Sequence, residues 1–260
     1  MQIPTDGINW FYTTEGQGEP LLFLHGGLDT CENYETLLAE LAKDFRVIAV
    51  DRRGHGRTAD TDAPFEYALM ADELISFTQA LDLPPFHIVG YSDGANLGLH
   101  MANRLPDKVK NLIAISANYL GVSGMSQGWL ETVEALSVDF VQEHMPEVAQ
   151  QYAELNPAPM LESFISKTKE LWSRDCVVEV EILQALQTPT LIVGGDRDIV
   201  LPEQLVDMKK LIPGASLLML PYCGHFVFQD FAWSNTAASS VAVFKDFLTT
   251  RFSAHNADFF

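Results

Sequence analysis

Short runs of consecutive apolar residues recur along the 260-residue chain, and helix-length stretches separate most of them. The runs are continuous rather than alternating, which is typical of strands buried on both faces of a parallel sheet. Stretches such as residues 33–43 and 67–81 are long enough for helices. This rhythm of strand and helix predicts an α/β doubly wound fold. The apolar runs occupy residues 21–24, 47–50, 88–89, 112–115, 191–193 and 217–220.

Two segments depart from this rhythm. Residues 8–15 alternate weakly between apolar and polar positions, which predicts an antiparallel edge strand. Residues 121–187 contain no buried strand, and prolines interrupt their helix-like segments. We therefore predict a core formed by residues 1–120 and 188–260. The insertion at 121–187 is expected to form a helical cap, or lid, over the carboxyl edge of the sheet.

The pentapeptide G-Y-S-D-G at residues 90–94 stands between an apolar run and a stretch with apolar residues at helical spacing. A G-x-S-x-G motif in this context forms a tight turn that holds the serine hydroxyl above the sheet. The flanking glycines let the strand and the helix cross closely without a Cβ clash. Ser92 is therefore the predicted nucleophile.

A serine hydroxyl is a weak nucleophile, so it needs a general base, and the base needs an orienting group. His225 is placed best among the seven histidines, because it follows the last apolar run at the carboxyl end of a strand. Asp196 and Asp198 both follow an earlier run. We assign Asp198, deeper in the loop, as the acid and Asp196 to the turn. Ser92, Asp198 and His225 thus form a predicted triad in the order Ser, Asp, His.

Acyl transfer also needs donors for the negative charge that develops on the carbonyl oxygen. One donor is expected to be the backbone N–H of Asp93, directly after the nucleophile. The second is expected from the glycine-rich loop after residues 21–24, where Gly27 is the candidate. Without a Cβ, Gly27 would let a substrate oxygen approach its N–H.

Composition narrows the possible partners. The formal net charge of −19 argues against nucleic acid and anionic membrane surfaces as partners. The chain has no basic leader and no apolar run near 18 residues, so we expect a soluble, cytoplasmic protein. Its three cysteines form no disulfide or zinc framework. No other cluster of candidate ligands accompanies the Asp-x-Asp at 196–198, so no metal site is expected. The triad chemistry needs no organic cofactor either.

These motifs together resemble those of α/β-hydrolase-fold serine hydrolases, over essentially the whole chain. They are H-G-G at 25–27, D-R-R-G-H-G-R-T at 51–58, G-Y-S-D-G at 90–94, G-D-R-D at 195–198 and G-H at 224–225. The resemblance implies an eight-stranded, mostly parallel sheet flanked by helices, with a helical cap between strands six and seven. It also implies that His25 and His55 are structural.

The Ser-Asp-Gly elbow is similar to that of valacyclovir-hydrolase-like amino-acid ester hydrolases. In those enzymes the equivalent carboxylate is implicated near the substrate amine, and carboxylates also outnumber basic residues within 121–187 of this chain. The simpler interpretation is that Asp93 caps the helix that it opens and that the other carboxylates form a solvated face.

The sequence thus predicts a serine hydrolase that cleaves a small carboxylic ester through an acyl-enzyme, without a cofactor. The same three residues would also serve a lactonase, a carbon–carbon bond hydrolase or a cofactor-free perhydrolase. A non-catalytic binding protein on this fold is a more remote alternative. The acyl and alcohol preference, the substrate-binding residues and the oligomeric state are not predicted.

Overall fold

The structure is a computed structural model that describes residues 1–250, so the last part of the predicted core, 251–260, lies outside the described residues. An eight-stranded sheet runs through the described chain in the order β1-β2-β4-β3-β5-β6-β7-β8. The strands are β1 (Gln2–Thr5), β2 (Ile8–Glu15), β3 (Pro20–Leu24), β4 (Arg46–Val50), β5 (Phe86–Tyr91), β6 (Val109–Ile115), β7 (Thr190–Gly195) and β8 (Ser216–Leu220). The predicted sheet is confirmed.

The six strands from β3 to β8 pair in parallel, and β1 and β2 are antiparallel. The register aligns Phe23 of β3 with Ala49 on one side and Val89 on the other. The strand expected at residues 8–15 forms and is antiparallel, but it is not the edge. The edge is β1, which was not predicted because its four residues give too short a pattern.

Helices cover both faces of the sheet, as the continuous apolar runs require. Successive residues of β3 point to opposite faces, so Leu22 and Leu24 join one core cluster while Leu21 and Phe23 join the other. The first cluster lies under α2, α3 and α9, and the second lies under α1 and α10. These helices are α1 (Glu35–Leu41), α2 (Tyr67–Ala80), α3 (Asp93–Arg104), α9 (Pro202–Leu211) and α10 (Asn235–Thr249).

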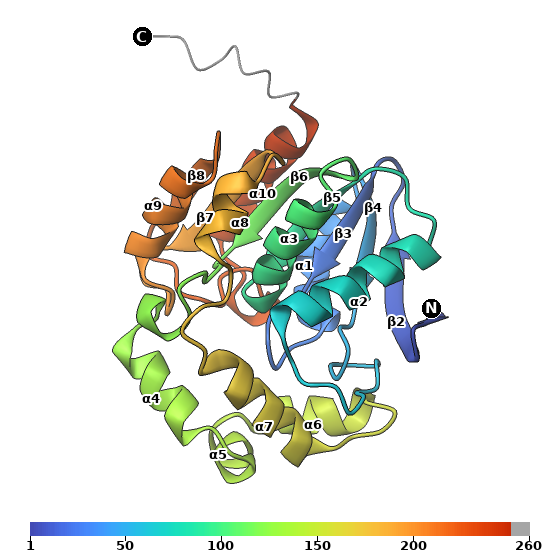
Figure 1. Cartoon of the computed structure of the whole chain (residues 1–260), viewed down its shortest axis with the longest axis vertical. Helices are drawn as coiled ribbons and strands as arrows, with labels where there is room; N and C mark the ends of the chain where they lie inside the picture. Colours follow the sequence, from blue (N-terminus) through green and yellow to red (C-terminus); the bar gives the residue numbers. More distant parts are fainter. Residues whose placement is uncertain (251–260) are drawn as a thin grey trace.

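Between β6 and β7 the chain is helical, with no strand among the described residues of this segment. Figure 1 shows α4, α5, α6 and α7 gathered at one end of the molecule, below the sheet, while α8 lies back beside the sheet helices. The bounds are α4 (Gln127–Ala135), α5 (Val138–His144), α6 (Pro146–Leu155), α7 (Leu161–Trp172) and α8 (Val180–Ala185). Three short 3-10 helices complete the described part of the chain: η1 (Cys31–Tyr34), η2 (Gly121–Gly124) and η3 (Asp230–Ala232).

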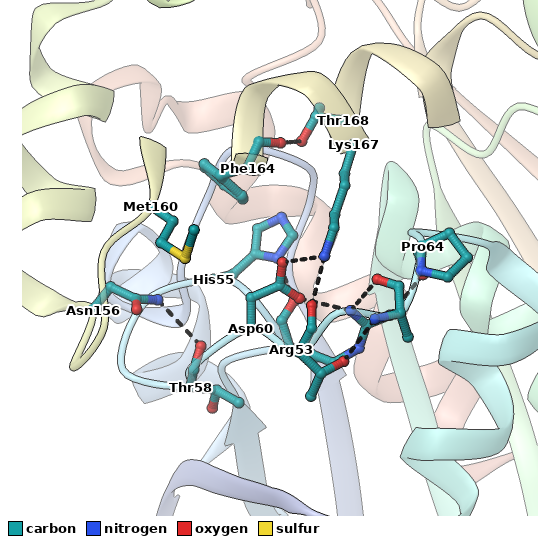
Figure 2. A network of polar contacts seen from close by, with 12 residues as sticks. Arg53, His55, Thr58, Asp60, Pro64, Asn156, Met160, Phe164, Lys167 and Thr168 are labelled. Atoms are coloured by element: carbon teal, nitrogen blue, oxygen red, sulfur yellow. Dashed lines mark hydrogen bonds and ion pairs between the residues drawn. The ribbon is translucent and has the colours of Figure 1, made fainter. Parts of the chain in front are cut away.

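A polar network fastens α7 and the loop before it to the loop after β4 (Figure 2). Lys167 Nζ lies 2.7 Å from one carboxylate oxygen of Asp60, and Arg53 Nη1 lies 2.7 Å from the other. The Arg53 side chain is fully buried. Asn156 Nδ2 donates to the carbonyl oxygen of Thr58 at 3.2 Å. Because Arg53 is buried in the core, these contacts hold α7 in a set position at that end of the sheet.

Within residues 1–250, no helix has the length and apolar character that a membrane-spanning segment needs.

Candidate active site

Ser92 occupies the turn between β5 and α3, directly after Tyr91. Its φ of 52° and ψ of −119° hold a non-glycine residue in a strained conformation, at a cost of about 1–3 kcal/mol. The Ser92 N–H donates to the carbonyl of Ile115 at 2.8 Å, which ties the turn to β6. A Cβ on Gly90 would come within 2.7 Å of Ala95 Cα, so glycine lets strand and helix cross this closely. The predicted strand, turn and helix surround Ser92.

His225 lies between Ser92 and Asp198, although the three residues come from three separate loops. Its Nε2 lies 3.1 Å from Ser92 Oγ, and its Nδ1 lies 2.7 Å from Asp198 Oδ1. His225 and Asp198 are both buried, whereas Asp196 is exposed. The structure therefore brings the three predicted residues together, in an arrangement that allows proton transfer from serine to histidine.

Two further donors hold the carboxylate of Asp198. The N–H of Val200 donates to Oδ1 at 3.0 Å, and the hydroxyl of Ser116 donates to Oδ2 at 2.5 Å. Burial raises the pKa of Asp198, but the contacts with His225, Ser116 and Val200 outweigh it and leave the pKa below its ordinary value. Asp198 is therefore ionised at neutral pH. Ser116 was not predicted, because a lone serine after an apolar run carries no motif.

The two predicted oxyanion donors lie beside the nucleophile. Gly27 and Asp93 both line the cavity next to Ser92, and a Cβ on the neighbouring Gly26 would lie 3.4 Å from Ser92 Cβ. The expected reason for glycine at position 27 needs correction. A Cβ on Gly27 would collide with the Asp93 carboxylate and the Trp172 ring, so protein atoms fill that space.

Asp93 as a residue is 4% exposed, and donors surround its carboxylate. The hydroxyl of Tyr67 donates to Oδ1 at 2.6 Å, and the indole N–H of Trp172 lies 3.1 and 3.2 Å from the two oxygens. Arg52 Nη2 lies 3.8 Å from Oδ2. Asp93 sits in the first turn of α3, but these contacts involve side chains rather than the helix backbone, contrary to the expected cap. Tyr67, Trp172 and Arg52 were not predicted, because no local pattern links them to the elbow.

The histidines of the glycine-rich loops make structural contacts. His25 Nε2 accepts from the backbone N–H of Arg52 at 3.0 Å, and its Nδ1 lies 2.8 Å from the carbonyl of Gly26. Burial and the nearby Arg52 charge lower the pKa of His25 and His55 well below the ordinary value. Both rings are therefore neutral, and His25 ties the loop that carries Gly27 to the end of β4.

Two hollows near the nucleophile share part of their walls. The inner cavity measures about 60 Å³ and contains Ser92 and His225 in its wall. The outer groove measures about 570 Å³ and runs between α6 and the loop after β3. Among the described residues that line either hollow, none is lysine or arginine. Both hollows share the residues Gly27, Asp29, Trp129, Trp172, Phe226 and Gln229.

Other reactive groups are arranged less favourably. Cys223 is buried, and its burial raises the pKa of the thiol, so the reactive thiolate is disfavoured. Cys31 is buried as well, whereas Cys176 is exposed. Over the described part of the chain, no cluster of three or more His, Cys, Asp or Glu side chains is arranged to hold a metal ion.

Comparisons with known proteins identify the family of the chain. The family profile described as "alpha/beta hydrolase fold" matches residues 19–171. A 2-hydroxymuconate semialdehyde hydrolase from Pseudomonas sp. (strain CF600) is 27% identical over 249 residues, which cover 86% of this chain and 87% of that protein. A 2-hydroxy-6-oxo-6-(2'-aminophenyl)hexa-2,4-dienoic acid hydrolase from Metapseudomonas resinovorans is 25% identical over 254 residues, covering 88% of this chain and 87% of that protein.

A similar solved structure is that of a serine hydrolase involved in carbazole degradation, with a TM-score of 0.76 and 24% identity. The match covers 96% of this chain and 98% of that one. At this identity the likeness concerns the fold, whereas the family profile covers more than half of the sequence. The chain therefore belongs to the α/β hydrolase fold family, and its curated relatives named above are hydrolases.

Proposed function

We propose that the protein hydrolyses small carboxylic esters through an acyl-enzyme on Ser92. The observation that carries the proposal is the continuous contact from Ser92 Oγ to His225 Nε2 at 3.1 Å and from His225 Nδ1 to Asp198 at 2.7 Å. This contact begins at a serine whose backbone is held in a strained turn. Strained backbone conformations of non-glycine residues cluster at functional sites, which supports a catalytic role for this serine.

In the proposed reaction, His225 accepts the hydroxyl proton as Ser92 Oγ attacks the ester carbonyl carbon. The N–H groups of Gly27 and Asp93 stabilise the resulting oxyanion. When the C–O bond breaks, His225 returns the proton to the leaving alcohol, and the acyl group remains on Ser92. His225 then takes a proton from water, whose oxygen attacks the acyl carbon. Collapse of this second intermediate releases the acid, and the proton returns to Ser92 Oγ.

Asp198 supports both steps. Its carboxylate accepts a hydrogen bond from Nδ1 of His225, which leaves Nε2 free to act as the base. When His225 becomes positively charged, the ionised carboxylate stabilises that charge. Val200 and Ser116 hold the carboxylate in this orientation.

Residues 121–187 are proposed to act as a cap over this site. Trp129 from α4 and Trp172 from α7 both line the inner cavity together with Ser92. Their ring centroids lie 5.1 Å apart, so the two helices present one aromatic wall. A wall of this kind keeps bulk water away from the oxyanion and strengthens the interactions that stabilise it.

The pocket charge favours an ester over the substrates for which the relatives are named. One relative is named for a dienoic acid, which carries a carboxylate. No lysine or arginine among the described residues lines the two hollows, so an anion would find no cationic partner there. The groove instead contains the carboxylates of Glu32, Glu147 and Glu154. A neutral ester is therefore the better candidate, and a neutral lactone would meet the same walls.

The test combines covalent labelling with turnover. The wild-type protein should be labelled by a fluorophosphonate and should hydrolyse short neutral esters, and Ser92→Ala should do neither. Ser123→Ala, on an exposed hydroxyl outside the site, is the matched control and should behave as wild type. Labelling without ester turnover, combined with cleavage of a dienoic acid, would replace the ester proposal with carbon–carbon bond hydrolysis. Unchanged labelling of Ser92→Ala would remove Ser92 as the nucleophile.

A further inference from the structure

The two hollows above the nucleophile differ strongly in size. The outer groove, at about 570 Å³, lies within the usual range of small-molecule pockets, which is about 300–1,000 Å³. The inner cavity, at about 60 Å³, lies far below it. Ser92 lines only the inner cavity. A substrate must therefore reach from the groove into a much smaller space, and one side of its scissile bond must be compact.

Asp93 lines the inner cavity, and Trp172 stands where the two hollows meet. Trp172 and Gly27 line both of them. The indole N–H of Trp172 donates to both oxygens of the Asp93 carboxylate, at N···O distances of 3.1 and 3.2 Å. A Cβ on Gly27 would collide with both side chains, so the pair packs directly against the loop beside the nucleophile. The carboxylate after the nucleophile thus fixes a ring that lines both hollows.

The charge of Asp93 is already balanced within the protein. Arg52 Nη2 lies 3.8 Å from the carboxylate and also donates to the carbonyl of Gly26 at 2.5 Å. The hydroxyl of Tyr67 supplies a third contact, and burial together with the Asp93 charge raises its pKa well above the ordinary value. The phenol therefore remains a donor. With these partners in place, the carboxylate is committed to the protein rather than to a cation from the substrate.

The helix that carries Trp172 is anchored separately. Lys167, little more than one turn before Trp172 on α7, contacts Asp60, which in turn contacts the buried Arg53 (Figure 2). Phe164 on the same helix packs against His55, with ring centroids 4.9 Å apart. The backbone of α7 therefore has its own attachment to the core. The contact with Asp93 adds something different, namely the orientation of the indole ring.

We propose that Asp93 and Trp172 form a specificity-determining pair. The Asp93 carboxylate orients the Trp172 ring, and the ring limits the acyl side of the substrate to a few carbons. The proposal rests on the ester hydrolysis proposed above. The acyl group stays on Ser92 while the alcohol departs, and the departing alcohol needs an exit to solvent. The alcohol side therefore occupies the groove, and the acyl side occupies the inner cavity. Exposed Phe231 and polar groups such as Asn33 and Gln151 line that groove, so it suits a larger, hydrogen-bonding, uncharged or cationic alcohol.

The experiment compares two Trp→Phe variants on p-nitrophenyl esters with acetyl, butanoyl, octanoyl and dodecanoyl groups. Trp172→Phe keeps an aromatic ring but removes the donor to Asp93. Trp129→Phe is the matched control, because its ring belongs to the same wall and, in the described chain, its indole makes no hydrogen bond to Asp93. Thermal unfolding verifies that both variants fold.

Wild type should prefer the two short acyl groups. In Trp172→Phe the ratio of kcat/KM for octanoyl over acetyl esters should rise on the order of tenfold, the low end for losing a charge-assisted hydrogen bond. In Trp129→Phe that ratio should change about threefold or less. Equal shifts in the two variants, or none in Trp172→Phe, would overturn the proposal. So would a wild-type enzyme that prefers dodecanoyl esters.

A second measurement does not depend on catalysis. Neutral symmetric ketones carry the same chain on both sides of the carbonyl and have no leaving group, so one chain must enter the inner cavity in either orientation, and binding to the folded protein raises its Tm. Pentan-3-one should stabilise wild type and Trp172→Phe, whereas undecan-6-one should stabilise Trp172→Phe alone. If this pattern appears while wild type hydrolyses no ester, the proposed function fails and the pair still limits the cavity. If undecan-6-one stabilises both proteins equally, the pair sets no limit, whatever the ester rates.

Discussion

Replacing Asp198 with asparagine tests how the acid supports His225, because the contacts of Asp198 dictate how an amide would sit there. Oδ1 accepts from both His225 Nδ1 and the backbone N–H of Val200, at 2.7 and 3.0 Å. Within residues 1–250, Oδ2 accepts from the hydroxyl of Ser116 alone, at 2.5 Å. An amide nitrogen at Oδ1 would face the Val200 donor. At Oδ2 it would face a hydroxyl that can turn and accept.

The asparagine oxygen should therefore take the Oδ1 position and keep the same tautomer of His225. What is lost is the charge that stabilises the protonated ring. A hydrogen bond to a charged group contributes about 1.5–3 kcal/mol and a neutral one about 0.5–1.5 kcal/mol, so the expected cost is about 1–2 kcal/mol. That corresponds to a fall in kcat of about 5- to 30-fold. An amide nitrogen facing His225 would instead cost about 10⁴-fold through the wrong tautomer.

The assay is kcat on a short neutral ester, measured from pH 5 to 9 for wild type, Asp198→Asn and the control Asp196→Asn. Asp196 is exposed, so its variant should stay within about twofold of wild type. A loss near 10⁴-fold in Asp198→Asn would refute the reasoning about the amide orientation. A large loss in Asp196→Asn with little effect in Asp198→Asn would move the acid to Asp196.

Four further outcomes are expected. Ser92→Ala should lose fluorophosphonate labelling and about 10⁶-fold in kcat. Gly27→Ala should lose about 10²-fold or more in kcat while remaining folded by circular dichroism, because the new Cβ collides with Asp93 and Trp172 and displaces an oxyanion donor. An ester with a carboxylate on its alcohol should have about a tenfold lower kcat/KM than its neutral isostere at low salt, and less difference at high salt, since exposed charges are screened. Because the folded-state pKa of Asp198 is lowered, its ionisation contributes stability that is present above the ordinary value of 3.8 and is lost as the pH falls through the lowered pKa. The difference in Tm between wild type and Asp198→Asn should shrink over that window.

Each of these has a clear contrary result. Residual labelling of Ser92→Ala would point to another nucleophile. A Gly27→Ala variant with wild-type kcat would show that the 27 N–H takes no part. Equal kcat/KM values for the anionic and neutral esters at low salt would mean that the groove carboxylates exert no electrostatic effect on the substrate. A Tm difference that grows below pH 3.8 would contradict the lowered pKa of Asp198.

The elbow and its surroundings could be predicted because local rules govern them. Gly90, Ser92 and Gly94 must sit in a tight turn between a strand and a helix, and consecutive residues of the chain carry all of that information. His225 and Asp198 could be placed because parallel strands end at one edge of a sheet, so loops after different strands meet there. Strand β1 was missed since four residues give too little pattern.

The contacts of Asp93 lay beyond this reasoning. The residue that holds it, Trp172, is 79 positions away in the chain, on a helix within the insertion. Ser116 and Asp198 are likewise 82 positions apart. Neither pair shows a periodicity or a motif, because each forms only when separate elements pack together. From the sequence, Asp93 could face the substrate or cap its helix, and the cap was the simpler interpretation.

The sequence by itself determined the fold class and the three candidate catalytic residues, since buried strands and tight turns leave their mark on neighbouring positions. Only the tertiary structure decided what surrounds those residues. It turned the carboxylate of Asp93 toward Trp172 and Arg52, and it divided the space above Ser92 into a small cavity and a large groove. The shape of a pocket depends on side chains that distant helices bring together. No local pattern in the sequence encodes those contacts, because they form only when the helices pack.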